Sequence, residues 1–159
     1  MKPGMRVLDI ACGRGRHSLA AAARGCNVVA VDQDPDRFKE AQAIADSKNL
    51  SIEWVVGDLT SYEIPSQSFD TVLIFNYLDR RRMPAFKEGV KVGGHMLFET
   101  FLESQRYQGW GPTDDEHLLK PGEVVRLIEP FELILAREVI EMVDGQPMAA
   151  GSALARRIS

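Results

Sequence analysis

The chain has 159 residues, of which 45% are hydrophobic and 26% are charged, and its formal net charge is −4 at neutral pH. This length suits one domain with one core, and the composition is typical of an ordinary globular protein. The acidic balance excludes a bulk attraction to nucleic acid or to an anionic membrane, so a polyanionic partner would need a local basic patch.

The densest basic run is Arg80, Arg81 and Arg82, which we interpret as the solvated entrance to a helix. The two cysteines, Cys12 and Cys26, are too few for a disulfide framework and lack the spacing of metal ligands, so no metal site is expected. The N-terminus has no apolar signal core, and no apolar run approaches the length that spans a membrane. We therefore expect a cytoplasmic protein with reduced thiols.

An apolar strand over residues 6–10 leads into a turn that contains Gly13 and Gly15, and an Ala-rich helix follows over residues 18–24. Glycine accepts positive φ and lets the backbone approach a ligand closely, while the start of a helix presents unpaired N–H groups. The turn therefore predicts a cradle for a ligand of nucleotide size.

Strand and helix signals continue to alternate after this turn. Asp34 and Pro35 read as the N-cap and first position of a second helix, and Gly93 with Gly94 reads as a turn before the fifth strand. Further strands are expected at 27–31, 51–56, 69–75 and 95–101, and further helices at 83–90 and 121–128. Such alternation predicts a parallel sheet with right-handed crossovers and helices on both faces.

The C-terminal part follows a different pattern. Pro130 ends the alternation, and two strands, 131–143 and 148–158, are joined through Asp144 and Gly145. A short Asp-Gly connection predicts a β-hairpin. The long segment between the fifth strand and the last helix is typical of a functional lid.

The glycine turn also distinguishes between nucleotide ligands. The nicotinamide fingerprint requires a third glycine at the position that Ser18 occupies. Counted from the acid that ends the first strand, the turn instead resembles motif I of the class I S-adenosylmethionine-dependent methyltransferases, with Asp9, Ala11, Gly13 and Gly15 at the motif spacing. Together with LLKPGE at 118–123, the run CGRGRHSL is most similar to small bacterial methyltransferases grouped with the tellurite-resistance methyltransferases.

This resemblance implies a Rossmann-like α/β fold with a doubly wound, mostly parallel seven-stranded sheet. The implied strand order is 3-2-1-4-5-7-6, and the C-terminal hairpin supplies the antiparallel strand. Relatives usually carry helices before the first strand that help to close the site, whereas only a few residues precede Arg6 here. We therefore expect a single methyltransferase domain over residues 1–159 that lacks these lid helices.

Ligands of open α/β sheets bind at the carboxyl ends of the strands. Asp32 ends the second strand, where a carboxylate can accept from two ribose hydroxyls, and the resemblance assigns Asp58 to the adenine amine. The alternatives are a helix-start role for Asp32 and a turn role for Asp58, and for Arg16 a surface salt bridge in place of a methionine carboxylate. The expected contacts to S-adenosyl-L-methionine are Asp9, Ala11, Gly13, Gly15, Arg16, Asp32, Gln33, Asp58, Leu59, Asn76 and Tyr77.

The methyl acceptor is inferred from missing motifs. Amino-methylases of DNA bases carry an Asn or Asp followed by two prolines and an aromatic residue, and the run Asn76-Tyr77-Leu78-Asp79 lacks both prolines. Base C5-methylases need a cysteine beyond the fourth strand, where this chain has none. A small-molecule acceptor is therefore favoured over nucleic acid, while the acceptor atom and the oligomeric state stay open.

Methyl transfer from a sulfonium depends mainly on alignment and exclusion of water, so an obvious catalytic triad is not required. His117, Glu99 and Tyr77 are the candidates for a base, each with a purely structural alternative. We predict an S-adenosylmethionine-dependent methyltransferase that acts on a small molecule by in-line displacement. The alternatives are a catalytically silent module that binds the cofactor for regulation or scaffolding, and a nicotinamide-dependent oxidoreductase, with which Ser18 and the terminal hairpin conflict.

Overall fold

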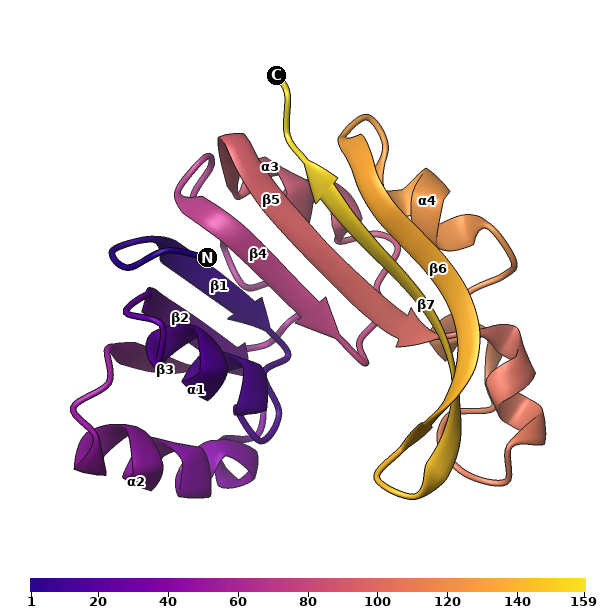
Figure 1. Cartoon of the computed structure of the whole chain (residues 1–159), viewed down its shortest axis with the longest axis horizontal. Coiled ribbons are helices and arrows are strands. Elements are labelled where there is room, and N and C mark those ends of the chain that lie inside the picture. The colour runs from indigo at the N-terminus through magenta and orange to yellow at the C-terminus, as the bar shows by residue number, and fades with distance from the viewer.

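A seven-stranded sheet in the order β3-β2-β1-β4-β5-β7-β6 forms the centre of the structure, a computed structural model that describes all 159 residues (Figure 1). The first five strands pair in parallel, and β7 runs antiparallel to both β5 and β6. The predicted fold class and strand order are therefore confirmed. The strands are β1 (Arg6–Ile10), β2 (Asn27–Asp32), β3 (Ile52–Val56), β4 (Phe69–Phe75), β5 (Val90–Phe101), β6 (Glu132–Val143) and β7 (Gln146–Arg156).

Helices lie on both faces of this sheet and create two apolar cores. On one face, α1 and α2 lie over the β1–β3 half, while α3 and α4 lie behind β4 to β6 (Figure 1). The bounds are α1 (Arg16–Ala22), η1 (Pro35–Phe38), α2 (Lys39–Ser47), α3 (Met83–Glu88), η2 (Glu103–Tyr107), η3 (Asp115–His117) and α4 (Glu123–Ile128). The central strands are buried on both sides, which explains their continuous apolar sequences. No helix combines the length and apolar character needed to span a bilayer.

Two predictions made from local sequence are confirmed, the helix cap at Asp34 and the tight turn at Asp144 and Gly145. Asp34 accepts a hydrogen bond from the N–H of Asp36 at 3.0 Å and caps η1. Asp144 and Gly145 both have positive φ, 49° and 79°, and form the tight connection between β6 and β7.

The prediction of a turn at Gly93 and Gly94 before the fifth strand is wrong. Both glycines lie inside β5, which begins at Val90 and pairs with β4. The register shifts between the pairs that contain Phe69 and Thr71, so the extra residues of β5 form a bulge, and Gly93 accommodates it with a φ of 79°. A glycine pair alone does not distinguish a bulge within a strand from a turn before it.

The expectation of a solvated arginine run is also wrong for two of its three members. Arg80 pairs with Glu123 and donates to the carbonyl oxygen of Leu118. Arg82 lies over the ring of Phe86 and donates to a backbone carbonyl. These side chains therefore fasten loops to the rest of the protein.

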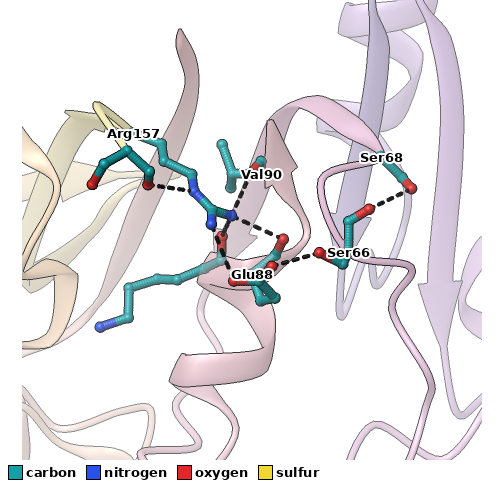
Figure 2. Close-up of polar contacts among 7 residues, drawn as sticks. Ser66, Ser68, Glu88, Val90 and Arg157 are labelled. Carbon is teal, nitrogen blue, oxygen red and sulfur yellow. Dashed lines mark hydrogen bonds and ion pairs between the residues drawn. The ribbon is translucent and has the colours of Figure 1, made fainter. Parts of the chain in front are cut away.

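Arg157 fastens the C-terminal end of the chain to the end of α3 (Figure 2). Its guanidinium donates to the carbonyl oxygens of Glu88 and Val90 at 3.1 and 2.8 Å, and it pairs with the Glu88 carboxylate at 3.1 Å. That carboxylate also accepts from the hydroxyl of Ser66. Because these bonds satisfy backbone carbonyls at and just after the end of α3, Arg157 has a structural role.

Gly15 starts α1 with a φ of 74° and lies directly against β3 and α2. A Cβ here would lie 2.8 Å from the ring of Trp54 and 2.9 Å from the Cβ of Ala41. Gly15→Ala places an alanine in a left-handed conformation and also forces its Cβ against packed atoms. We expect the packing clash to lower the free energy of unfolding by about 1 to 3 kcal/mol in addition to the backbone cost. Gly109→Ala is the matched control, because Gly109 has a φ of 80° and open space around it. Equal losses in urea denaturation would contradict the packing role.

Candidate functional site

The carboxyl ends of β1, β2 and β4 border a cavity of about 440 Å³. Since β1 pairs in parallel with both β2 and β4, all three strands end at the same side of the sheet. The volume falls within the usual range of small-molecule sites, about 300–1,000 Å³. The lining residues are Asp9, Ala11, Cys12, Gly13, Arg14, Arg16, His17, Asp32, Gln33, Arg37, Leu59, Phe75, Asn76, Tyr77, Phe101, Trp110, Val143, Asp144, Gln146 and Met148.

Most of the predicted cofactor residues meet at this cavity, and two do not line it. Gly15 instead packs against Trp54. Asp58 is exposed, and its carboxylate accepts from the hydroxyl and the N–H of Thr60 at 2.7 and 2.9 Å, bonds that lower its pKa. The structure thus gives Asp58 a turn role, while the neighbouring Leu59 lines the cavity. A contact from Asp58 to adenine remains a prediction.

The carboxylate of Asp32 is buried, with a relative exposure of 1%, and holds the glycine turn in place. One oxygen accepts the N–H of Gly13 at 2.9 Å, and the other accepts the N–H of Asp34 at 3.0 Å. A carboxylate has about four acceptor positions, so both oxygens keep capacity for a ligand. Arg37 lies 3.7 Å from the same carboxylate and also lines the cavity. Arg37 was not among the predicted site residues, because nothing in the local sequence indicates that η1 turns its side chain back towards Asp32.

Asp9 is almost fully buried beneath the glycine turn and accepts a hydrogen bond from the hydroxyl of Ser18 at 2.6 Å. Burial raises the pKa of Asp9 from 3.8 to about 7, although the bonds from Ser18 act in the opposite direction. Ser18 therefore has a clear function at the position where a dinucleotide-binding protein has its third glycine. Its hydroxyl joins α1 to the end of β1.

The raised pKa of Asp9 makes the stability of the unliganded protein depend on pH. In the unfolded chain this carboxyl ionises near pH 4, whereas in the folded protein it keeps its proton until about pH 7. Its contribution is therefore complete below about pH 4 and is lost as the pH rises towards 7, by about 1 kcal/mol per pH unit. We expect Asp9→Asn to remove this slope from the free energy of unfolding measured in urea. Asp46→Asn, on the exposed side of α2, is the control, and a slope retained in Asp9→Asn would contradict the assignment.

The side chains of His17 and Cys12 contribute uncharged surface to the cavity. The ring of His17 stacks on Phe75, with centroids 3.7 Å apart and an interplanar angle of 16°. Burial and the neighbouring Arg16 lower the pKa of His17 to about 4, so the imidazole is neutral at physiological pH. Burial, reinforced by the carboxyls of Asp9 and Asp32, raises the pKa of Cys12 to about 12. Cys12 is therefore a protonated thiol and unsuited to act as a nucleophile.

Two non-glycine residues with left-handed backbones open the cavity between the strands. Ala11 follows β1 with a φ of 55°, and Asn76 follows β4 with a φ of 54°. Each turns the chain sharply away from the sheet directly after its strand. Strained backbones of this kind occur preferentially at functional sites.

The far wall of the cavity comes from the C-terminal half of the chain. Val143, Asp144, Gln146 and Met148 belong to the tip of the β6–β7 hairpin, which extends past the ends of β4 and β5 (Figure 1). The indole N–H of Trp110 donates to the carbonyl oxygen of Pro147 at 2.6 Å and links the segment after β5 to this tip. Trp110 is the residue of this segment that lines the cavity, while a lid function of the segment remains a prediction. The hairpin tip was missed, because the sequence does not show how far β6 and β7 extend past the ends of β4 and β5.

A second cavity of about 220 Å³ adjoins the first. Asn76, Tyr77 and Phe101 line both cavities, and the remaining lining residues of the second are Leu78, Thr100, Pro112 and His117. None of these seven residues is Asp, Glu, Lys or Arg. Of the three predicted candidates for a base, His117 and Tyr77 therefore border the second cavity. Glu99 lines neither one, and its carboxylate lies 3.8 Å from the guanidinium of Arg137.

Comparison with known proteins identifies the family. The family profile described as "Methyltransferase domain" matches residues 7–92, more than half of the chain. The chain therefore belongs to this methyltransferase family, and its fold is that of the class I S-adenosylmethionine-dependent enzymes, as predicted. S-adenosyl-L-methionine is the cofactor of the family.

Individual relatives support this assignment over parts of their length. A protein of Haemophilus influenzae named as a probable S-adenosyl-L-methionine-dependent methyltransferase, TehB, is 29% identical over 99 residues, which cover 58% of this chain and 34% of TehB. An uncharacterized protein of Mycobacterium tuberculosis is 35% identical over 71 residues, or 45% of this chain and 26% of that protein. The chain thus spans about a quarter to a third of these two relatives.

Solved structures confirm the fold. The crystal structure of TehB from Haemophilus influenzae superposes with a TM-score of 0.81 at 20% identity, over 97% of this chain and 58% of that one. An S-adenosylmethionine-dependent methyltransferase from Methanosarcina mazei gives a TM-score of 0.78 at 19% identity, over 99% of this chain and 94% of that one. At such identities the likeness concerns the fold alone.

Proposed function

We propose that this protein transfers a methyl group from S-adenosyl-L-methionine to a small, uncharged acceptor. The observation that carries the proposal is that the two cavities adjoin. Three residues, Asn76, Tyr77 and Phe101, line both of them. A cofactor in the larger cavity and an acceptor in the smaller one would contact each other beside these three residues. Such a two-compartment site suits an in-line displacement, because it aligns two reactants and excludes water from the space between them.

The residues of the larger cavity fit the cofactor. Asp32 has acceptor capacity left on both oxygens for a ribose diol, and Gly13 allows close approach of the backbone, since a Cβ there would already lie 3.1 Å from Arg37. Leu59 offers an apolar surface for the adenine ring, and Arg16 offers a cation for the methionine carboxylate. When bound, the cofactor would supply a methyl group on a sulfonium, whose sulfur leaves readily as a neutral thioether when the methyl group is transferred.

The smaller cavity supports an acceptor of limited size and no net charge. An apolar cavity of about 150 Å³ binds benzene, so 220 Å³ corresponds to an acceptor of about one ring or its aliphatic equivalent. A charged acceptor would find no side chain of opposite charge among Asp, Glu, Lys or Arg in this lining, which disfavours it. The amide of Asn76 and the hydroxyls of Tyr77 and Thr100 offer hydrogen bonds to a polar group. His117 is the side chain best suited to accept a proton from an acceptor hydroxyl or thiol.

Calorimetric titration tests the cofactor half of this proposal. We expect the chain to bind S-adenosyl-L-methionine and not a nicotinamide dinucleotide, and Asp32→Asn to weaken binding by about 1 to 3 kcal/mol, because one acceptor oxygen becomes a donor. Asp46→Asn on α2 is again the control. Thermal melting of both variants separates a lost ligand contact from a disordered glycine turn. Heat with the dinucleotide and none with S-adenosyl-L-methionine would contradict the proposal.

A labelled-methyl assay tests the acceptor half. We expect product with uncharged phenols, alcohols or thiols of about one ring, and none with metalloid oxyanions or with nucleic acid. In His117→Gln, a fall in turnover that high pH restores would indicate that this imidazole takes the acceptor proton. Tight cofactor binding without product from any acceptor would favour a catalytically silent module. Product with oxyanions alone would overturn the assignment of an uncharged acceptor.

A further inference from the structure

The edge strand β6 is unusually long and apolar on its exposed side. It has 12 residues, ends the strand order of the sheet, and has no strand beyond its outer edge (Figure 1). Leu135, Ile140 and Met142 are 61%, 59% and 66% exposed, and Leu133 and Ile134 beside them are also exposed. Proteins usually protect such an edge, because it offers a ready template for another strand.

The register of the hairpin shows which backbone groups of β6 are free. The two-residue turn at Asp144 and Gly145 makes Val143 and Gln146 a hydrogen-bonded pair. From there, hydrogen-bonded and non-hydrogen-bonded pairs alternate along β6 and β7. Ala149 confirms the alternation: its N–H donates to the side chain of Gln105 and its carbonyl accepts from Leu102, so its backbone points away from β6. Its cross-strand neighbour, Ile140, correspondingly points its N–H and C=O outward. The outward-facing residues are Ala136, Glu138, Ile140 and Met142.

We propose that two copies of the chain pair their β6 strands antiparallel, with Val139 opposite Val139 of the second copy. In this register the outward residues pair with each other, Ala136 with Met142 and Glu138 with Ile140, giving roughly eight main-chain hydrogen bonds. The two sheets then continue as one across a twofold axis perpendicular to them.

Charge complementarity selects this register. It places Arg137 of each copy directly opposite Glu141 of the other, in the pair type where side chains approach most closely. Moving the centre by one residue to 138 puts Glu138 opposite Glu138, and moving it to 137 puts Arg137 opposite Arg137. Like charges at directly opposed positions are destabilising. Moving it by one residue the other way, to Ile140, brings no like charges together, but it gives up the Arg137–Glu141 pairs and pairs fewer of the outward residues. In the single chain, Arg137 and Glu141 form an exposed pair with each other at 2.9 Å, and such exposed pairs contribute little, so they are available for exchange.

The same register places three of the exposed apolar side chains against the second copy and reaches the functional site. Leu135 packs opposite Val143 of the second copy, while Met142 and Ile140 lie against its Ala136 and Glu138. Val143 also lines the larger cavity. The second copy would therefore restrain the hairpin end that forms the far wall of the cavity.

Sedimentation equilibrium of the 159-residue chain tests the association itself. We expect a concentration-dependent monomer–dimer equilibrium, and we expect Ile140→Lys to raise the dimer dissociation constant about tenfold or more, because an edge lysine blocks strand pairing. Ile44→Lys is the matched control, since Ile44 is also exposed but lies on α2. A chain that stays monomeric at all concentrations, or a dimer equally stable in Ile140→Lys, would overturn the proposal.

Cross-linking tests the register. In the proposed pairing, Val139→Cys faces itself in a non-hydrogen-bonded pair, at a spacing that a disulfide can bridge, so mild oxidation should yield a covalent dimer. Val92→Cys is the control, an exposed valine away from β6, and the native Cys12 and Cys26 are buried. Charge reversal adds a second readout: Arg137→Glu should weaken the dimer and the pair Arg137→Glu with Glu141→Arg should restore it. No cross-link at residue 139 in a protein that dimerises would overturn this register.

Discussion

The buried carboxylate of Asp32 is the interaction on which the cavity depends. It lies at the end of β2 and accepts backbone N–H groups from the glycine turn after β1 and from the start of η1. One ionisable side chain thus determines how three segments approach each other at the carboxyl edge of the sheet. Because its donors are backbone groups, the arrangement tolerates exchange of the side chains around it and depends strongly on the acid itself.

The surroundings of this carboxylate have less charge than the sequence suggests. Asp9 has its pKa raised to about 7, His17 is neutral because its pKa is lowered to about 4, and Cys12 keeps its proton. Burial is the main cause of all three shifts. The other ionisable side chains that line the cavity are Asp32, Asp144, Arg14, Arg16 and Arg37, so cationic groups are available to a ligand carboxylate.

The C-terminal hairpin links several parts of the structure. It contributes the antiparallel strand that completes the sheet, its tip closes the far side of the larger cavity, and its outer strand presents the apolar edge. Trp110 anchors the tip through the carbonyl oxygen of Pro147. A change that moves this hairpin is therefore expected to affect both the shape of the site and the surface available to a second copy.

Sequence alone determined the features that depend on neighbouring residues. The first strand, the glycine turn, the Asp34 cap and the Asp144–Gly145 connection follow from local backbone preferences, and apolar runs bounded by turn residues were enough to place the strands, apart from the start of β5. The resemblance to motif I then supplied the strand order and the acids at the strand ends. Only the tertiary structure decided that Ser18 bonds Asp9, that Arg37 turns towards Asp32, that Asp58 serves its own turn and that the hairpin tip lines the cavity. These contacts join residues through the spatial order of the strands, and the energies that select them come from burial and packing, which no local pattern records.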